Sequence, residues 1–181
     1  ITAIALVDED AAVCSVQNGV LPVAFEMLND DNNDMVRFTA VKLINELARR
    51  PVLRPRLVGF KRGPGELSSR MEPMDHHEKS LLIRLFRLAR EEFESPLCRL
   101  VRENSMIAIQ HLCENHPVAN AVQEEALKNN VVAILTEQMD VGTELGKVAA
   151  IELLINIWPK YEDALIEDFK ARALAEELEK Q

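Results

Sequence analysis

The sequence contains few of the residues that interrupt helices or build sheets. Among its 181 residues there are six glycines and eight prolines, and aromatic residues make up only 4%. Leu, Ala, Glu, Val and Ile dominate instead, and hydrophobic residues account for 48% of the chain. No stretch shows a strand pattern, so no glycine-rich phosphate loop follows a strand. The composition predicts an all-α protein, large enough for one core-bearing domain or a short array of repeats.

Basic charge is also scarce. The chain has 21 Lys and Arg residues against 30 Asp and Glu residues, which gives a formal net charge of −9. Nucleic acid and anionic lipid both require a basic face, so the charge argues against either as the main ligand. No apolar run approaches the ~20 residues of a membrane span. We therefore expect partners that are proteins, with no nucleic acid and no membrane span.

Cysteine is rare and irregularly placed. Cys14, Cys98 and Cys113 are an odd number at unrelated spacings. Such residues are typical of reduced, small core side chains in an intracellular protein rather than of a disulfide framework. No signal-peptide pattern opens the chain. The expected location is intracellular and cytoplasmic.

The stretch from Asn18 to Pro51 contains two apolar-striped segments separated by a polar turn, Asn29–Asp34. Each segment has helical period, and neither could bury its stripe alone. Asn18 and Gly19 predict the end of a short helix over 11–17, because glycine tolerates the left-handed conformation after a helix. This stretch predicts a unit made of one short helix and two longer ones.

The pattern recurs along the chain. Val36-Arg37-x-x-Ala40 aligns with Val101-Arg102-x-x-Ser105, and Lys147 holds the position of Val36 in a weaker third copy with Ile151, Leu154 and Ile155. Asn129-Asn130-Val131-Val132 likewise repeats Asn18-Gly19-Val20-Leu21. The copies predict units of about 45 residues, a period typical of helical repeat proteins. The expected divisions are the tail of a preceding repeat at 1–10, repeats at 11–57, 80–117 and 118–160, an inserted loop at 58–79, and a charged C-terminal helix at 161–181.

These motifs resemble those of armadillo repeat proteins, in the armadillo/HEAT superfamily. The residues that carry the resemblance are the Asn18–Pro22 junction, the Val36–Ala40 start and the Leu43–Ala48 finish. The resemblance implies a right-handed α-α superhelix, here of about three repeats plus a partial end unit. It also implies that the third helices line a groove that binds extended peptides or partner helices. The groove residues implied are Asn45, Gln110 and Asn156, with Lys42 beside them.

The sequence departs from the family at one set of groove positions. The nuclear-import adaptors carry a tryptophan one turn before the asparagine, and this chain has Val41, Met106 and Glu152 there. The resemblance therefore does not extend to binding of nuclear-import signals. Because the chain opens at Ile1 inside an apolar helical pattern, we expect a fragment or subunit of a larger assembly.

One basic cluster precedes and enters the expected insertion. It could complement helix dipoles and coat a solvated loop, or it could dock an acidic surface such as a tubulin tail or another subunit. Its members are Arg49, Arg50, Arg54, Arg56, Lys61 and Arg62.

The chemistry-bearing side chains do not form a convincing site. His76, His77 and Glu78 could be half of a metal site, but no further ligand lies at suitable spacing. His111 and Cys113 are scattered around a helix, which favours packing and capping roles. We therefore expect neither metal nor cofactor, and we do not expect an enzyme. The sequence favours a non-catalytic protein-interaction scaffold in a cytoskeletal, ciliary or transport assembly. The alternative is a HEAT-type regulatory subunit or chaperone-like adaptor that grips one client protein.

Overall fold

The computed structural model describes residues 8–29, 32–60, 80–91, 95–114 and 117–179. Over these ranges the chain is helical, with short connections and no β-strand. The prediction of an all-α protein is confirmed. Residues 1–7 of the expected tail of a preceding repeat (1–10) and most of the expected insertion lie outside the described residues.

The helices follow one another in a repeating order of lengths. Helices α2 (Glu9–Gln17) and α3 (Val20–Met27) precede the long helix α4 (Asp34–Ala48). A 3₁₀ turn at Pro51–Leu53 and α5 (Arg54–Val58) then lead to α6 (Leu81–Arg90) and the long α7 (Pro96–Cys113). Helices α8 (Ala119–Lys128) and α9 (Val131–Val141) precede α10 (Glu144–Glu179). Each long helix is therefore preceded by two shorter ones.

Local sequence explains where the helices begin. Asn33 caps α4 by accepting a hydrogen bond from the Val36 backbone N–H at 3.0 Å, and Ser95 caps α7 by accepting one from the Cys98 N–H at 3.1 Å. These side chains satisfy donors that a helix leaves unpaired at its first turn. Gly19 joins α2 to α3 with a φ of +84°, a conformation that costs glycine little. The predicted stop at Asn18-Gly19 is thus confirmed.

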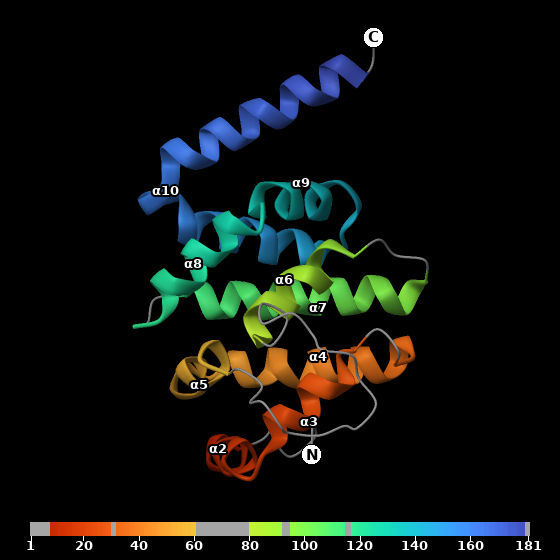
Figure 1. Ribbon diagram of the computed structural model, residues 1–181, viewed down its shortest axis with the longest axis vertical. Helices are drawn as coiled ribbons and strands as arrows, with labels where there is room; N and C mark the ends of the chain where they lie inside the picture. The colour runs from red at the N-terminus through yellow and green to blue at the C-terminus, as the bar shows by residue number, and fades with distance from the viewer. Residues whose placement is uncertain (1–7, 30–31, 61–79, 92–94, 115–116, 180–181) are drawn as a thin grey trace.

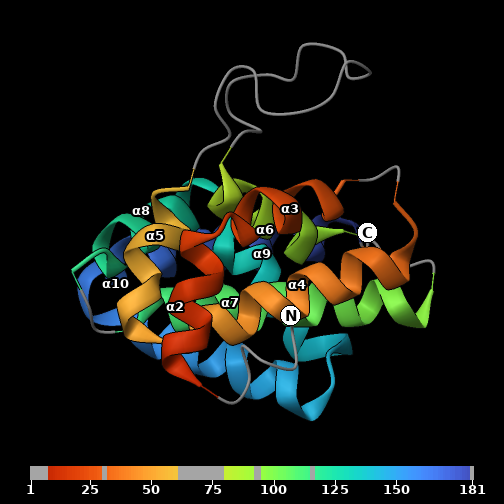
Figure 2. The ribbon, with the colours of Figure 1, turned by 90° about the horizontal axis from the view of Figure 1, so that it is seen from below.

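The long helices pack side by side and form one layer. Helix α7 packs against α4 on one side and α10 on the other, and α6 packs on α7 as α9 packs on α10 (Figure 1). Figure 2 shows the molecule along its long axis, with α4 and α7 one behind the other and α5 and α8 together at one edge. The predicted apolar stripes meet inside this stack. Among their residues, Leu43, Leu47, Leu85 and Phe86 are buried.

The expected insertion begins later than predicted. Phe60 belongs to the folded part, because its ring packs against Phe25 with 5.7 Å between the ring centroids. The Leu81 N–H donates a hydrogen bond to the Phe60 carbonyl at 3.3 Å. Phe60 and Leu81, which flank most of the expected insertion, are therefore adjacent in the fold.

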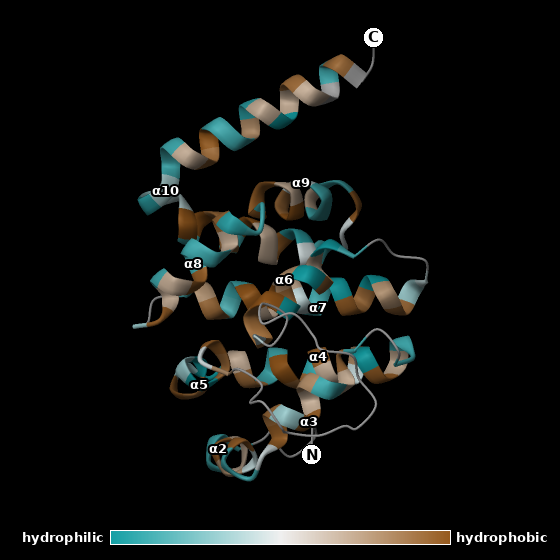
Figure 3. Ribbon diagram, in the orientation of Figure 1, coloured by the Kyte–Doolittle hydropathy of each residue, from teal (hydrophilic) through white to brown (hydrophobic). Residues whose placement is uncertain are grey.

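The expected C-terminal helix at 161–181 begins at a kink within α10. Helix α10 runs through Pro159 and departs from helical geometry only at Tyr161 (φ −129°, ψ 26°). Proline removes one backbone donor and clashes with the preceding turn, which explains a bend at this place. Beyond the bend the helix turns away from the layer (Figure 1) and alternates hydrophilic with hydrophobic residues (Figure 3). Leu165 is fully buried and Phe169 packs on the core, so the first turns of this segment are docked rather than solvated.

Candidate functional site

Two of the expected groove residues lie inside the fold. Asn45 is buried, and its amide Nδ2 donates a hydrogen bond to Asn104 Oδ1 of α7 at 3.1 Å. Gln110 is also buried, and its Nε2 donates to Glu114 Oε1 at 3.0 Å. The Asn45 amide thus connects α4 to α7, whereas the Gln110 amide bonds within the end of its own helix. The expectation that these two residues line an open groove is corrected, because both side chains are buried.

The other two groove candidates are more accessible. Asn156 of α10 is half-buried, and its backbone carbonyl accepts a hydrogen bond from Gln123 Nε2 at 3.2 Å. Lys42 of α4 is exposed, with its ammonium nitrogen 5.9 Å from the centroid of the Phe38 ring. The structure therefore does not bring the four residues together on one open surface.

The residues of the expected basic docking patch are also divided between buried and exposed positions. Arg54 is buried, its Nε donates to the Ala48 carbonyl at 2.8 Å, and its guanidinium pairs with Glu114. It holds α5 in place and does not belong to an exposed patch. Arg49 lies 3.4 Å from Glu46, and Arg50 donates to the Glu46 carbonyl at 2.9 Å. Arg56 is exposed, while Lys61 and Arg62 lie outside the described residues.

Glu114, at the end of α7, contacts three polar side chains. Besides Arg54 and Gln110, His111 Nδ1 lies 2.9 Å from its Oε1. Burial alone would raise the pKa of the Glu114 carboxyl, but hydrogen bonds from His111, Arg54 and Gln110 and the Arg54 charge together lower it. The carboxylate form is therefore the form that this network stabilises.

Arginine–glutamate pairs join successive groups of helices. Arg37 of α4 pairs with Glu91 at the end of α6, and Arg102 of α7 pairs with Glu137 of α9. We call each of these arginine–glutamate contacts between groups of helices a joint. Arg37 and Arg102 hold equivalent positions in the sequence repeat, so the two joints are built alike. A buried guanidinium requires such a partner, since an unpaired buried charge is costly.

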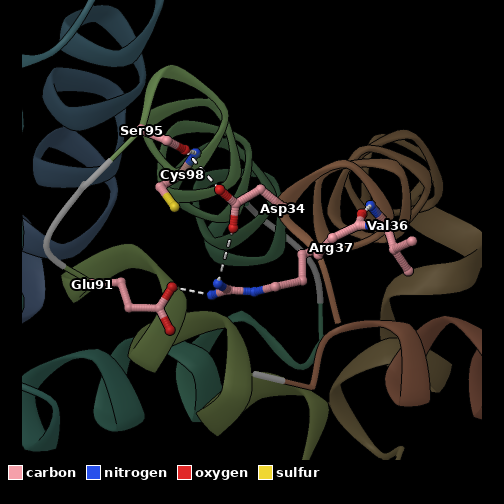
Figure 4. Close-up of polar contacts among 7 residues, drawn as sticks. Asp34, Val36, Arg37, Glu91, Ser95 and Cys98 are labelled. Carbon is pink, nitrogen blue, oxygen red and sulfur yellow. Dashed lines mark hydrogen bonds and ion pairs between the residues drawn. The ribbon is translucent and has the colours of Figure 1, made fainter. Parts of the chain in front are cut away.

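The first joint has an additional link (Figure 4). Asp34 Oδ2 accepts a hydrogen bond from the Ser95 hydroxyl at 2.7 Å, and its other oxygen lies 3.7 Å from Arg37. Hydrogen bonds from Ser95 and Cys98, with a smaller contribution from the Arg37 charge, lower the pKa of Asp34. Asp34 therefore connects the start of α4 to the start of α7.

A crevice lies beside the first joint. It has a volume of about 380 Å³ and is lined by Ile83, Arg84, Arg87, Arg90, Glu91 and Asn129. Arg84 is buried, with its Nη2 3.2 Å from Asn29 Oδ1 and its guanidinium 5.8 Å from the centroid of the Phe25 ring. Three arginines at i, i+3 and i+6 lie on one side of α6, which gives this crevice a positive lining in an otherwise acidic chain. The arrangement could hold a carboxylate-bearing segment.

An exposed apolar surface on α10 is the feature that the sequence prediction missed. Leu145, Val148, Ile151 and Ile155 are 64%, 50%, 45% and 63% exposed. The buried face of this helix is instead formed by other residues: Ala149, Ala150, Leu153 and Ile157. The weaker third copy of the repeat thus places Ile151 and Ile155 on an exposed face. The signal was present in the sequence, since apolar residues recur with helical spacing on both faces of this helix.

Within the described residues, no group of three or more His, Cys, Asp or Glu side chains is arranged to hold a metal ion. The expected half-site at His76, His77 and Glu78 lies outside them. Cys113 is buried, and burial raises the pKa of its thiol. Among the described helices, none is both long enough and apolar enough to cross a membrane.

Comparisons with protein-family models, with curated proteins and with solved structures find no match to this chain.

Proposed function

We propose that this chain is a non-catalytic protein–protein interaction scaffold, built as an armadillo- or HEAT-like array of about three helical units. The observation that carries the proposal is the repeated joint. Helices α4, α7 and α10 form one layer, and equivalent arginines, Arg37 and Arg102, bridge each group of helices to the next. In such arrays each unit contacts its neighbours, which leaves long continuous faces for partners.

The surfaces support protein partners more than other ligands. A formal charge of −9 disfavours nucleic acid, whereas the exposed apolar side chains of α10 favour a protein surface. Of the expected groove residues, Lys42 and Asn156 remain candidates for partner contact, and Asn45 and Gln110 are assigned structural roles. The resemblance to armadillo proteins suggests an intracellular setting in a cytoskeletal, ciliary or transport assembly.

The arginine-lined crevice on α6 supports a second candidate. A HEAT-type regulatory subunit or adaptor that grips a single client could seat one acidic segment there, against Arg90 at the exposed end of α6. An acidic surface such as a tubulin tail would then dock at α6 rather than at the expected patch around Arg54.

Crosslinking mass spectrometry in cell extract tests the scaffold proposal. A lysine-reactive reagent reports on the long-helix layer through Lys42 and Lys147, and on its edge through Lys128. We expect more cross-links to the same partner proteins from Lys42 or Lys147 than from Lys128. The K42R variant is the control, because it keeps the charge but removes the reactive amine, so its cross-link alone should disappear. The proposal is wrong if the folded chain yields no partner beyond those captured by the heat-denatured chain.

A further inference from the structure

The exposed apolar residues of α10 form one stripe. Leu145, Val148, Ile151 and Ile155 follow one another at intervals of three, three and four residues, which places them along one side of a helix. The opposite side of the same helix packs on α7 and α9. A helix with apolar residues on opposite sides is typical of a buried element, and this one is covered on only one side.

The sequence repeat shows what the equivalent positions do elsewhere. Val148, Ile151 and Ile155 align with Arg37, Ala40 and Ile44 of α4 and with Arg102, Ser105 and Ile109 of α7. All six of these residues are buried. The stripe on α10 therefore occupies the face that, in the two other long helices, is covered by the next group of helices.

The chemistry of the stripe differs from that of the two covered faces. Each covered face carries an arginine that pairs with a glutamate of the next group, and Val148 replaces that arginine. Each also has a small residue, Ala40 or Ser105, where α10 has Ile151. If another group of helices packed here in the same way, its glutamate would face Val148 and would have no arginine to pair with. The occupant of the stripe must therefore be apolar where it meets Val148.

Acidic residues border the stripe. Glu144 and Glu152 of α10 are exposed on the same side of the helix, and Asp140 is exposed at the end of α9. The Glu144 Oε1 atom lies 3.8 Å from the Lys147 Nζ atom, and all three acidic side chains are exposed to solvent. A partner with lysine or arginine at its flanks would complement this border.

We propose that the α10 stripe binds an amphipathic helix of another protein, one with leucine or isoleucine along one face and basic residues on its flanks. This inference rests on the proposed scaffold function and names the chemistry of its partner. Helix-in-groove recognition uses anchors at i, i+3 or i+4, and i+7, which is the spacing that Val148, Ile151 and Ile155 present. A second copy of the chain is a poorer occupant, because two stripes face to face would bring the acidic borders together.

The probe is a fluorescently labelled synthetic peptide of about 18 residues, long enough for five helical turns. It carries leucines on one helical face and lysines elsewhere. One control peptide replaces the lysines with glutamates, and a second scrambles the same composition so that no apolar face forms. Fluorescence anisotropy measures the binding of each peptide to the full chain.

We expect the lysine peptide to bind at least about tenfold more tightly than either control. The double variant I151S/I155S should weaken its binding by about tenfold or more, because it removes central apolar contacts without changing charge. The matched controls are V23S and L174S, which alter residues of 59% exposure on α3 and on the C-terminal part of α10. Neither control should change the affinity.

Two results would overturn the inference. One is a wild-type chain that light scattering shows to be dimeric and that I151S/I155S makes monomeric, since a second copy would then occupy the stripe. The other is peptide binding that is absent or unaffected by I151S/I155S. If partner cross-links at Lys42 persist in either case, the scaffold function stands and only its assignment to this stripe fails.

Discussion

At the scale of single residues, the fold depends on buried arginines. Arg37, Arg54 and Arg102 are all buried, and each pairs with a glutamate from a different helix or helix end. Removing one partner of a buried pair costs roughly 3–5 kcal/mol. That figure is an upper bound here, because the side chains of the three glutamates remain 30%, 36% and 40% exposed.

The Glu114 network gives the Arg54–Glu114 pair a testable pH dependence. Its folded-state pKa is lowered, so its contribution to stability is fully present above the unfolded-state pKa of about 4.3 and is lost as pH falls through the folded-state value. We expect E114Q to lower the free energy of unfolding at pH 7. The gap between wild type and E114Q should close toward pH 3. Urea denaturation at several pH values measures both.

The matched control for this prediction is E152Q, which neutralises an exposed glutamate of α10. It should leave the free energy of unfolding nearly unchanged across the range. A gap between wild type and E114Q that stays constant down to pH 3 would contradict the role of the charged carboxylate.

The roles of individual polar residues were the least predictable part of the sequence. Asn45 and Gln110 fit a groove by their positions in the repeat, yet both are buried, Asn45 against Asn104 of α7 and Gln110 against Glu114 at the end of its own helix. The reason is that α7 is covered on both sides of the layer, so an amphipathic pattern cannot distinguish a groove face from a joint face. Arg54 was equally ambiguous, since its partner Glu114 is 60 residues away.

At the scale of elements, the sequence predicted the helices well and their surroundings less well. The apolar period and the Asn18-Gly19 stop were readable, because they depend on residues close together in the chain. The stripe on α10 was not, because periodicity reports that a face is apolar but not whether anything covers it. The docking of the segment beyond Pro159 involves the core contacts of Leu165 and Phe169, which no local pattern reports.

Those contacts predict how the C-terminal segment behaves. Leu165 is fully buried, so L165A removes a core side chain at a cost of roughly 2–5 kcal/mol. Because the segment is attached at one end only, we expect this loss to undock residues 162–179 and leave α4 and α7 intact. Hydrogen exchange should show loss of protection in 162–179 alone.

L174A is the control for the same experiment, since Leu174 is 59% exposed and should contribute little. Equal loss of protection in both variants would mean that the segment is held by something other than the Leu165 contact. Loss of protection throughout the chain in L165A would mean that the segment and the layer unfold as one.

At the scale of the whole molecule, α7 has the central place in the stack. It packs against α4, α6, α8 and α10, whereas α2 packs only on α3 among the larger interfaces. In an array whose units contact mainly their neighbours, stability is a sum of unit and interface contributions, and opening begins at the ends. The number of interfaces that each helix forms therefore predicts an order of local stability.

Native-state hydrogen exchange of the wild-type chain measures that order. The amides of α7 should exchange most slowly, those of α4 and α6 next, and those of α2 and the C-terminal part of α10 fastest. Low denaturant should narrow the differences, because global unfolding exposes more surface than opening of the ends and its free energy therefore falls more steeply. If all helices instead show one common free energy of opening that falls with denaturant in parallel, the chain unfolds as a single cooperative unit. The repeats would then be present in the sequence pattern, but the units would not have separate stabilities.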